Sequence, residues 1–208
     1  QTFHEASEVL GRDLWHLVVA GPTSALNETQ NTQPIMLAAG VAIWRVWRAQ
    51  QGVIPVLMAG HSLGEYTAMV CSEALDFKEA VALVVDRASY MQAAVPVGQG
   101  GMAAILGLDD DAVARLCQQV AEGEVLSPVN FNSPGQVVVA GSAVAIQRLI
   151  KAAPAAGAKR AIQLPVSVPS HCSLMYTAAR QMEHRLSQVS PYCPLPPDCL
   201  IYFPSASA

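Results

Sequence analysis

A serine between two glycines is the feature of this sequence whose residue types and spacing point most directly to chemistry. Gly60-His61-Ser62-Leu63-Gly64 matches G-x-S-x-G, in which a nucleophilic serine lies on a sharp turn between a strand and a helix. The glycines let neighbouring backbone pass without a Cβ clash, and the Leu63 N–H can donate to an oxyanion at the start of the helix. Because an apolar run precedes the motif and a helical pattern follows it, we interpret Ser62 as a nucleophile rather than as a serine in a glycine-flanked turn.

A serine nucleophile needs a base, and five histidines are available. Three of them fall on predicted amphipathic helices, where a surface role is favoured, and His61 adjoins Ser62, where an elbow directs alternate side chains apart. His171 follows the loop residues Pro169-Ser170 and precedes a predicted helix, whose N-terminal end would hold it neutral, as a base must be. The residues favour His171 as the base and leave a packed loop histidine as the alternative. The three helical histidines are His4, His16 and His184.

Arg87 interrupts an otherwise apolar helical stretch, residues 80–87. It could form a surface ion pair with a neighbour such as Asp86, or its planar fork could hold a carboxylate bidentately. Composition does not decide between these two roles. Asn130 and Asn132 end a predicted strand, where turn formation is the default interpretation.

Composition limits the class of protein. The chain has 208 residues, enough for one large or two small domains, with 52% hydrophobic and 13% charged residues, so disorder is excluded. The net charge of −4, without a Lys/Arg cluster, argues against nucleic-acid binding. No apolar run is long enough to span a bilayer, and the first residues do not form a signal peptide. Five widely spaced cysteines with no CxxC suggest a reducing compartment and no metal site.

Around the motif, periodicity predicts helices and one short buried strand. Thr32 can cap the second of these helices, Pro34 is tolerated in its first turn, and Gly52 ends it. After Pro191 the proline density predicts irregular structure, so residues 190–208 are expected to hold no regular element. The predicted helices are 3–17, 31–50, 63–73, 76–93 and 173–189, and the predicted strand is 53–59.

Between the glycines near residue 100 and Pro165 the order of elements is distinctive. The sequence predicts strand, helix, strand, strand, helix and strand, which is the ferredoxin-like arrangement and fits an inserted domain over residues 94–168. Asp109 is expected to cap the first of the two helices. The predicted strands are 102–108, 126–132, 136–140 and 159–164, and the helices are 109–122 and 142–156.

Three long stretches of the sequence resemble motifs of one protein family, and they occur in the same order along the chain as in that family. They are residues 60–66, 128–138 and 165–172, and the likeness, which covers about residues 1–189, is to the malonyl-CoA:acyl carrier protein transacylases of bacterial fatty-acid synthesis. The resemblance implies that Ser62 is the nucleophile, His171 the base and Arg87 the group that holds the malonyl carboxylate. It implies an α/β fold, with an α/β-hydrolase-like large subdomain over residues 1–93 and 169–208.

The reaction that the resemblance implies is a ping-pong transfer. Malonyl would pass from malonyl-CoA to Ser62 and then to the phosphopantetheine thiol of acyl carrier protein, through tetrahedral intermediates that need an oxyanion hole. No cofactor or metal is implied. We expect a cytoplasmic monomer whose partners are malonyl-CoA and acyl carrier protein, with no nucleic acid and no membrane.

The sequence also departs from the family pattern. The family has an N-terminal strand with a loop that completes the oxyanion hole, and a later glutamine that orients the histidine; neither has a counterpart here. The chain has no initiator methionine, and its likeness to the family is expected to end at Val189. We therefore expect this chain to be a fragment that lacks both ends.

Three alternative functions remain. An acyltransferase domain of a polyketide synthase shares the elbow, arginine and histidine, although Val168-Pro169-Ser170 matches the stand-alone transacylases. A serine esterase shares the elbow, but it needs an acidic partner for its histidine and would have no use for a buried Arg87. A catalytically impaired module that only binds a carrier protein would lack turnover.

Overall fold

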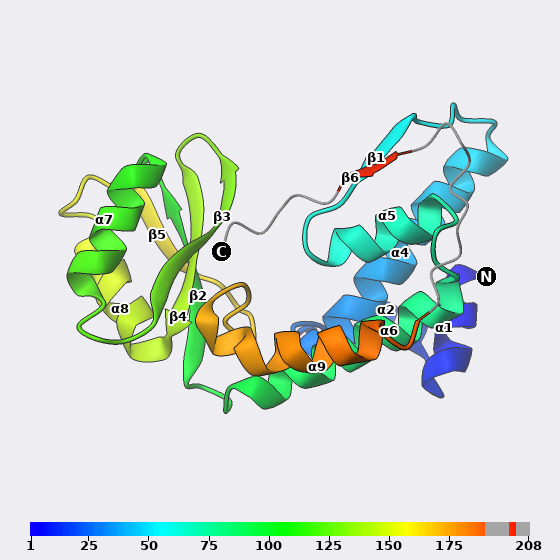
Figure 1. Cartoon of the computed structure of the whole chain (residues 1–208), viewed down its shortest axis with the longest axis horizontal. Helices are drawn as coiled ribbons and strands as arrows, with labels where there is room; N and C mark the ends of the chain where they lie inside the picture. Colours follow the sequence, from blue (N-terminus) through cyan, green and yellow to red (C-terminus); the bar gives the residue numbers. More distant parts are fainter. Residues whose placement is uncertain (190–199, 203–208) are drawn as a thin grey trace. The chain divides into compact units, whose positions relative to one another are not determined.

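A computed structural model of the chain describes residues 1–189 and 200–202 and has an α/β fold, as predicted (Figure 1). The described elements, in chain order, are α1 (Thr2–Leu10), α2 (Leu14–Ala20), α3 (Thr23–Leu26), α4 (Thr29–Ala49), β1 (Leu57–Ala59), α5 (Leu63–Cys71), α6 (Phe77–Ala94), β2 (Gly100–Leu106), α7 (Asp110–Val120), β3 (Leu126–Ser133), β4 (Gln136–Ser142), α8 (Ala143–Ala152), β5 (Arg160–Gln163), the 3-10 helix η1 (Ser173–Met175), α9 (Tyr176–Leu186) and β6 (Leu200–Tyr202).

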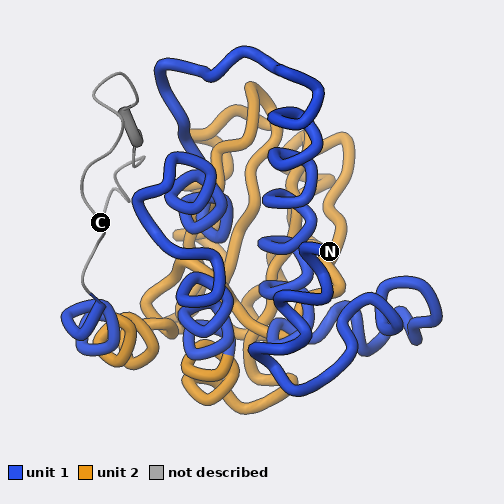
Figure 2. Tube along the Cα trace, turned by 90° about the vertical axis from the view of Figure 1, so that its right-hand side faces the viewer, with its two compact units in different colours: residues 1–88, 183–208 blue, residues 89–182 orange. Residues whose placement is uncertain are grey.

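The chain divides into two compact units, which Figure 2 distinguishes by colour. The first unit contains Gln1–Ala88 and Glu183–Ala208, and the second contains Ser89–Met182. Helices α6 and α9 each contribute residues to both units, so the unit boundaries fall inside helices.

The first predicted helix, 3–17, is two helices in the structure. Gly11 ends α1 in the left-handed conformation, with φ 65°, and its N–H donates to Ser7 O. Asp13 then starts α2, because its carboxylate accepts a hydrogen bond from His16 N at 2.9 Å. A glycine in the left-handed region is a typical helix end, and the apolar spacing concealed it because both helices keep the same period.

Helix α4 begins earlier than predicted, at Thr29, so Thr32 is not its cap and Pro34 lies inside the helix. Thr32 Oγ1 instead donates to Glu28 O at 3.0 Å. Pro34 has no N–H for the carbonyl four residues earlier, Gln30 O. Arg12 Nη2 donates to that oxygen at 3.0 Å, so a side chain replaces the hydrogen bond that the proline removes.

Strand β1 is shorter than predicted and pairs in parallel with β6. The pairing starts only after Pro55, which cannot donate to a ladder, and Val53 is 80% exposed. The prediction that residues 190–208 hold no regular element is wrong for residues 200–202, because the interval between Pro197 and Pro204 keeps every backbone N–H. Residues 190–199 and 203–208 lie outside the described part of the chain.

The second unit contains a four-stranded antiparallel sheet in the order β3-β4-β2-β5. Its elements follow the predicted order of strand, helix, strand, strand, helix and strand. Helices α7 and α8 cover one face (Figure 1), and side chains on the central strands alternate between that face and the other. Ala103 and Ile105 contribute to the core under the helices, whereas Met102 and Ala140 face the opposite cluster with Cys172.

The predicted cap at Asp109 is confirmed, since its side chain accepts a hydrogen bond from Ala112 N at 2.6 Å. The last predicted helix, 173–189, is a short turn of 3-10 helix, η1, followed by α9. Asn130 is not a turn residue: it lies inside β3 opposite Val138, and it is buried.

Candidate active site

Ser62 lies between β1 and α5 with a backbone conformation that serines rarely adopt. Its φ is 56° and its ψ −109°, in the region of positive φ that costs energy for residues with a Cβ. The turn is closed by Gly64 N donating to His61 O at 2.9 Å and Glu65 N donating to Ser62 O at 3.2 Å. This strained strand-to-helix turn has the geometry of a nucleophile elbow.

Only one of the two glycines in the motif is required by close approach. A Cβ on Gly60 would lie 1.9 Å from Gly64 C and 2.3 Å from Glu65 N, distances that no side chain can accept. A Cβ on Gly64 would meet nothing within 4 Å. The elbow therefore depends on Gly60, and the steric reason expected for Gly64 is wrong.

Arg87 projects from α6 toward Ser62, within the first unit. Its Nη2 donates to Ser62 Oγ at 2.9 Å, and its Nη1 donates to Gln33 Oε1 at 2.5 Å. The guanidinium carbon also lies 6.0 Å from the centre of the Tyr66 ring, a cation–π distance. The alternative of an ion pair with Asp86 is wrong, because Asp86 accepts a hydrogen bond from Arg185 Nε at 2.8 Å.

The charge of Arg87 is not neutralised by a carboxylate in the described part of the chain. No Asp or Glu within residues 1–189 and 200–202 forms an ion pair with it. Burial lowers the pKa of Arg87 from its ordinary value, and burial raises the pKa of Glu65, the nearest acid on α5. Both directions reflect charges that have lost water without gaining a direct partner of opposite sign.

Gln33 is the residue of this site that the sequence analysis missed. Its Nε2 donates to Thr29 Oγ1 at 2.8 Å, one turn earlier on α4, while its Oε1 accepts from Arg87. Gln33, Leu37 and Val41 are all buried and follow one another at four-residue intervals, so the glutamine lies on the buried face of the helix. The sequence feature that could have predicted its role is a glutamine on an apolar helix face, because a buried amide needs hydrogen-bond partners.

Leu63 is the first residue of α5, and its N–H belongs to the helix end that has no intrahelical acceptor. Among the hydrogen bonds of residues 1–189 and 200–202, none uses this N–H. The predicted oxyanion donor is thus next to Ser62 and available within the described chain.

His171 belongs to the second unit and is described by itself. It is an exposed loop residue with φ 67°, so it is not a packed histidine. The loop around it is anchored by Val168, which is 3% exposed, and by Cys172, whose Sγ donates to Pro169 O at 3.2 Å. The structure brings Ser62, Leu63 and Arg87 together in one unit, and the role of His171 with them stays a prediction.

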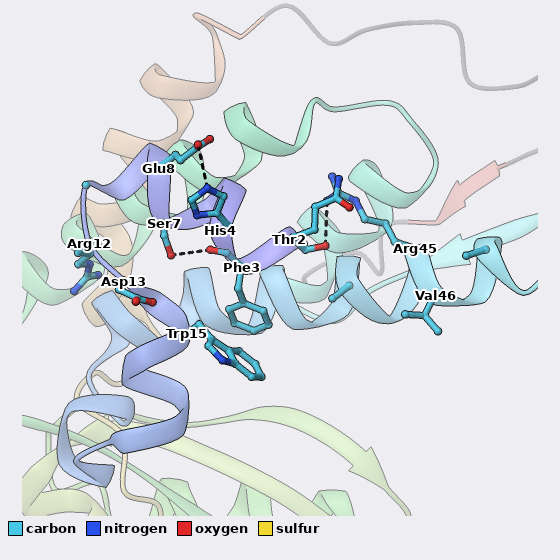
Figure 3. Close-up of a pocket in the computed structure, with 14 residues that line it drawn as sticks. Thr2, Phe3, His4, Ser7, Glu8, Arg12, Asp13, Trp15, Arg45 and Val46 are labelled. Atoms are coloured by element: carbon cyan, nitrogen blue, oxygen red, sulfur yellow. Dashed lines mark hydrogen bonds and ion pairs between the residues drawn. The ribbon is translucent and has the colours of Figure 1, made fainter.

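A cavity of about 970 Å³ between α1 and α4 is formed by other residues (Figure 3). Phe3 and Trp15 contact each other there with tilted rings, whose centroids lie 5.2 Å apart. Arg45 is paired with Glu5 at 2.8 Å, and Ser7 Oγ donates to Phe3 O at 2.7 Å. Arg45 and Ser7 thus connect α1 to neighbouring helices, and none of the predicted site residues lines the cavity.

Two features are absent from the described part of the chain. Within the described ranges, no three or more His, Cys, Asp or Glu side chains are placed to hold a metal ion. None of the helices in the same ranges has the length and apolar character needed to cross a membrane.

Comparison with known proteins assigns the family. Residues 4–203 match the acyl transferase domain, and the chain belongs to this family. The match continues beyond Val189, so the expectation that the likeness ends there is wrong.

Individual relatives carry more specific names. Over 197 residues the chain is 56% identical to the malonyl CoA-acyl carrier protein transacylase of Salmonella typhimurium, covering 95% of this chain and 64% of the relative. A crystal structure of an acyl carrier protein S-malonyltransferase from Vibrio cholerae is 54% identical, with a TM-score of 0.87, over 97% of this chain and 65% of that one. A malonyl-transacylase in complex with its type II PKS acyl-carrier protein is 54% identical, with a TM-score of 0.91, over 97% of this chain and 64% of that one. The chain therefore spans a little under two thirds of the length of these relatives.

Proposed function

We propose that this protein transfers a malonyl group from malonyl-CoA, through an ester on Ser62, to the phosphopantetheine thiol of acyl carrier protein in fatty-acid synthesis. The observation that carries the proposal is the partly buried Arg87 guanidinium, which has no carboxylate partner in the described chain and donates to Ser62 Oγ at 2.9 Å. A cation in this position suits an acyl group that brings its own carboxylate to the nucleophile. The names of the relatives support the same activity.

In the first half-reaction, His171 accepts the proton of Ser62 as Oγ attacks the thioester carbonyl carbon. The oxyanion of the tetrahedral intermediate accepts a hydrogen bond from Leu63 N–H. The intermediate then collapses to the serine ester, and the coenzyme A sulfur leaves with the proton from His171. In the second half-reaction His171 takes the proton of the carrier thiol, the sulfur attacks the ester, and Ser62 recovers its proton.

The alternatives explain Arg87 less well. An esterase acting on neutral esters gains nothing from a partly buried cation beside its nucleophile. An acyltransferase domain of a polyketide synthase would use the same residues, and the flanking sequence of the full gene discriminates it. A module that only binds a carrier protein has no need of the strained backbone at Ser62.

The proposal also includes the two subdomains of the fold. We propose a ferredoxin-like subdomain over residues 94–168, supported by the strand order β3-β4-β2-β5. We propose an α/β-hydrolase-like subdomain for residues 1–93 and 169–208, supported by the β1–Ser62–α5 turn. We further propose a cytoplasmic monomer that uses no cofactor or metal and binds neither nucleic acid nor membrane.

The test is to identify the acylated residue. We expect the protein, mixed with malonyl-CoA and digested, to carry malonyl on the peptide that contains Ser62, and Ser62→Ala to lose the adduct while keeping its circular dichroism spectrum. His171→Ala should slow both acylation and the return transfer to a carrier thiol. An adduct on a cysteine or on another serine would contradict the proposal.

A further inference from the structure

Arg87 is held on two sides by groups that carry no charge. Gln33 Oε1 accepts from Nη1 and Ser62 Oγ accepts from Nη2, and the Tyr66 ring lies nearby at 6.0 Å. A guanidinium has five N–H donors, so these two hydrogen bonds leave three for a ligand. That number is enough for a bidentate carboxylate.

A hydrogen bond to Thr29, on the side away from Arg87, determines the orientation of the Gln33 amide. Its Nε2 donates to Thr29 Oγ1 at 2.8 Å, and both residues lie on α4, 5% and 8% exposed. With the nitrogen directed at the hydroxyl, the oxygen is the end that faces Arg87. A buried amide held in this way has little freedom to rotate its donor end toward the guanidinium, where two donors would oppose each other.

We propose that Gln33 is a positioning residue that selects for a carboxylated acyl group: it orients Arg87 beside Ser62 without neutralising its charge. The inference rests on the proposed function. An aspartate or glutamate at this place would hold the guanidinium as firmly, but it would satisfy the charge and compete with the carboxylate of the substrate. A neutral amide oxygen fixes the direction of the fork and leaves the positive charge for the ligand.

The direct test is Gln33→Glu, which keeps the size of the side chain and adds a carboxylate next to Arg87. We expect kcat/KM for malonyl-CoA to fall by about ten-fold or more, mostly through KM, because the incoming carboxylate meets a neutralised arginine. Acylation by acetyl-CoA should change by less than about two-fold, because acetyl makes no use of the charge. Equal losses for the two acyl groups, or no loss for either, would overturn the proposal.

A matched pair of variants at Thr29 tests the orientation of the amide. Thr29→Val removes the hydroxyl acceptor at nearly constant volume and should lower the preference for malonyl over acetyl, whereas Thr29→Ser keeps the hydroxyl and should retain that preference. If both variants behave alike, Thr29 does not orient Gln33 and the proposed arrangement is wrong. Thermal unfolding of each variant identifies losses that come from unfolding.

Binding separates this proposal from the proposed function. In a Ser62→Ala background no ester forms, and calorimetry with malonyl-CoA and acetyl-CoA reports recognition alone. Gln33→Glu should weaken malonyl-CoA and leave acetyl-CoA unchanged, and equal effects on both would overturn the positioning role. Absence of a malonyl adduct in the wild-type protein would instead contradict the proposed transfer reaction, whatever the binding data show.

Discussion

Two arginines of the same compact unit, Arg45 and Arg87, lie in similar settings and differ in one respect. Each stacks near an aromatic ring, Arg45 at 5.0 Å from Phe77 and Arg87 at 6.0 Å from Tyr66. Each also donates to a hydroxyl. Arg45, however, is paired with the Glu5 carboxylate at 2.8 Å, whereas Arg87 has an amide oxygen in the corresponding role.

The serines near these arginines differ in the same way. Ser7, on α1, donates to Phe3 O and accepts from Leu14 N at 3.0 Å, so its hydroxyl connects α1 with the start of α2. Ser62 sits in a strained turn with the Arg87 guanidinium at its oxygen. The comparison indicates that near α1 an ion pair and a serine with helical backbone stabilise the packing of the helices. At the elbow, by contrast, a guanidinium without a carboxylate and a serine with positive φ are both able to interact with a ligand.

The largest effect should follow a change at Gly60. Gly60→Ala introduces a Cβ that would lie 1.9 Å from the Gly64 carbonyl carbon. Because the obstacle is backbone, we expect a loss of about 3 kcal/mol of stability, at the upper end of the range for overpacking, together with loss of the malonyl adduct. Gly64→Ala is the control and should cost no stability, since its Cβ meets open space. Chemical denaturation and adduct mapping measure both. Similar stability losses in the two variants would show that the contact at Gly60 does not decide the turn.

Replacing each arginine by alanine should show that the region of Arg87 affects malonyl transfer, whereas the region of Arg45 affects stability. A charge-assisted hydrogen bond contributes about 1.5–3 kcal/mol, so Arg87→Ala should lower malonyl transfer by roughly ten- to a hundred-fold or more and leave acetyl transfer little changed. Arg45→Ala should keep the ratio of malonyl to acetyl transfer and lose at most about 1 kcal/mol of stability, because its ion pair is partly exposed. If Arg87→Ala lowered both acyl transfers equally, Arg87 would be structural, as Arg45 is.

A double-mutant cycle tests the structural role of a third arginine, Arg12. We expect Arg12→Ala to cost about 1 kcal/mol in the wild-type protein, because Gln30 O then loses the donor that replaces the missing N–H of Pro34. In a Pro34→Ala background the helix can form its own bond to Gln30 O, so the same substitution should cost less by about 0.5 kcal/mol. Urea unfolding of the four proteins gives the coupling. Strict additivity would mean that Arg12 acts independently of the proline.

The smallest effects concern pH, where the two regions should differ in sign. The hydrogen bond from Arg45 lowers the pKa of Glu5 below 4.5, so the ionised form stabilises the folded state above that pH and the gain is lost on acidification. Burial raises the pKa of Glu65, so its ionised form is destabilising at neutral pH and the cost disappears as the pH falls.

Glutamine variants measure these two contributions. At about pH 7, Glu5→Gln should lower and Glu65→Gln should raise the free energy of unfolding, each by less than about 1 kcal/mol. As the pH falls through the pKa of each carboxyl group, its variant should approach the wild-type value, and Glu65→Gln should do so at higher pH than Glu5→Gln because the pKa of Glu65 is raised and that of Glu5 is lowered. Shifts of the same sign at neutral pH would contradict the contrast between the regions.

Much of the local structure could be predicted from the sequence. The turn at Ser62 and the cap at Asp109 depend on residues a few positions apart, and so does the succession of strands and helices in the second unit. Each is decided by φ preferences and hydrogen bonds within one or two turns of chain, which residue types report directly. The break at Gly11 was equally local and was missed only because the apolar period continues across it.

The tertiary structure alone decided which side chains meet. Arg87 could have paired with Asp86, but the Asp86 carboxylate accepts a hydrogen bond from Arg185, which is 99 residues away in the chain. The Arg87 guanidinium instead donates to Gln33, which is 54 residues away. It also decided that Arg12 would compensate Pro34 and that β6 would pair with β1. These contacts depend on how helices distant in the sequence pack and on which polar groups are buried together. The spacing of residues along the chain does not predict either. The sequence by itself therefore determined a serine elbow and its flanking elements, while packing determined that the arginine beside the serine would keep its charge.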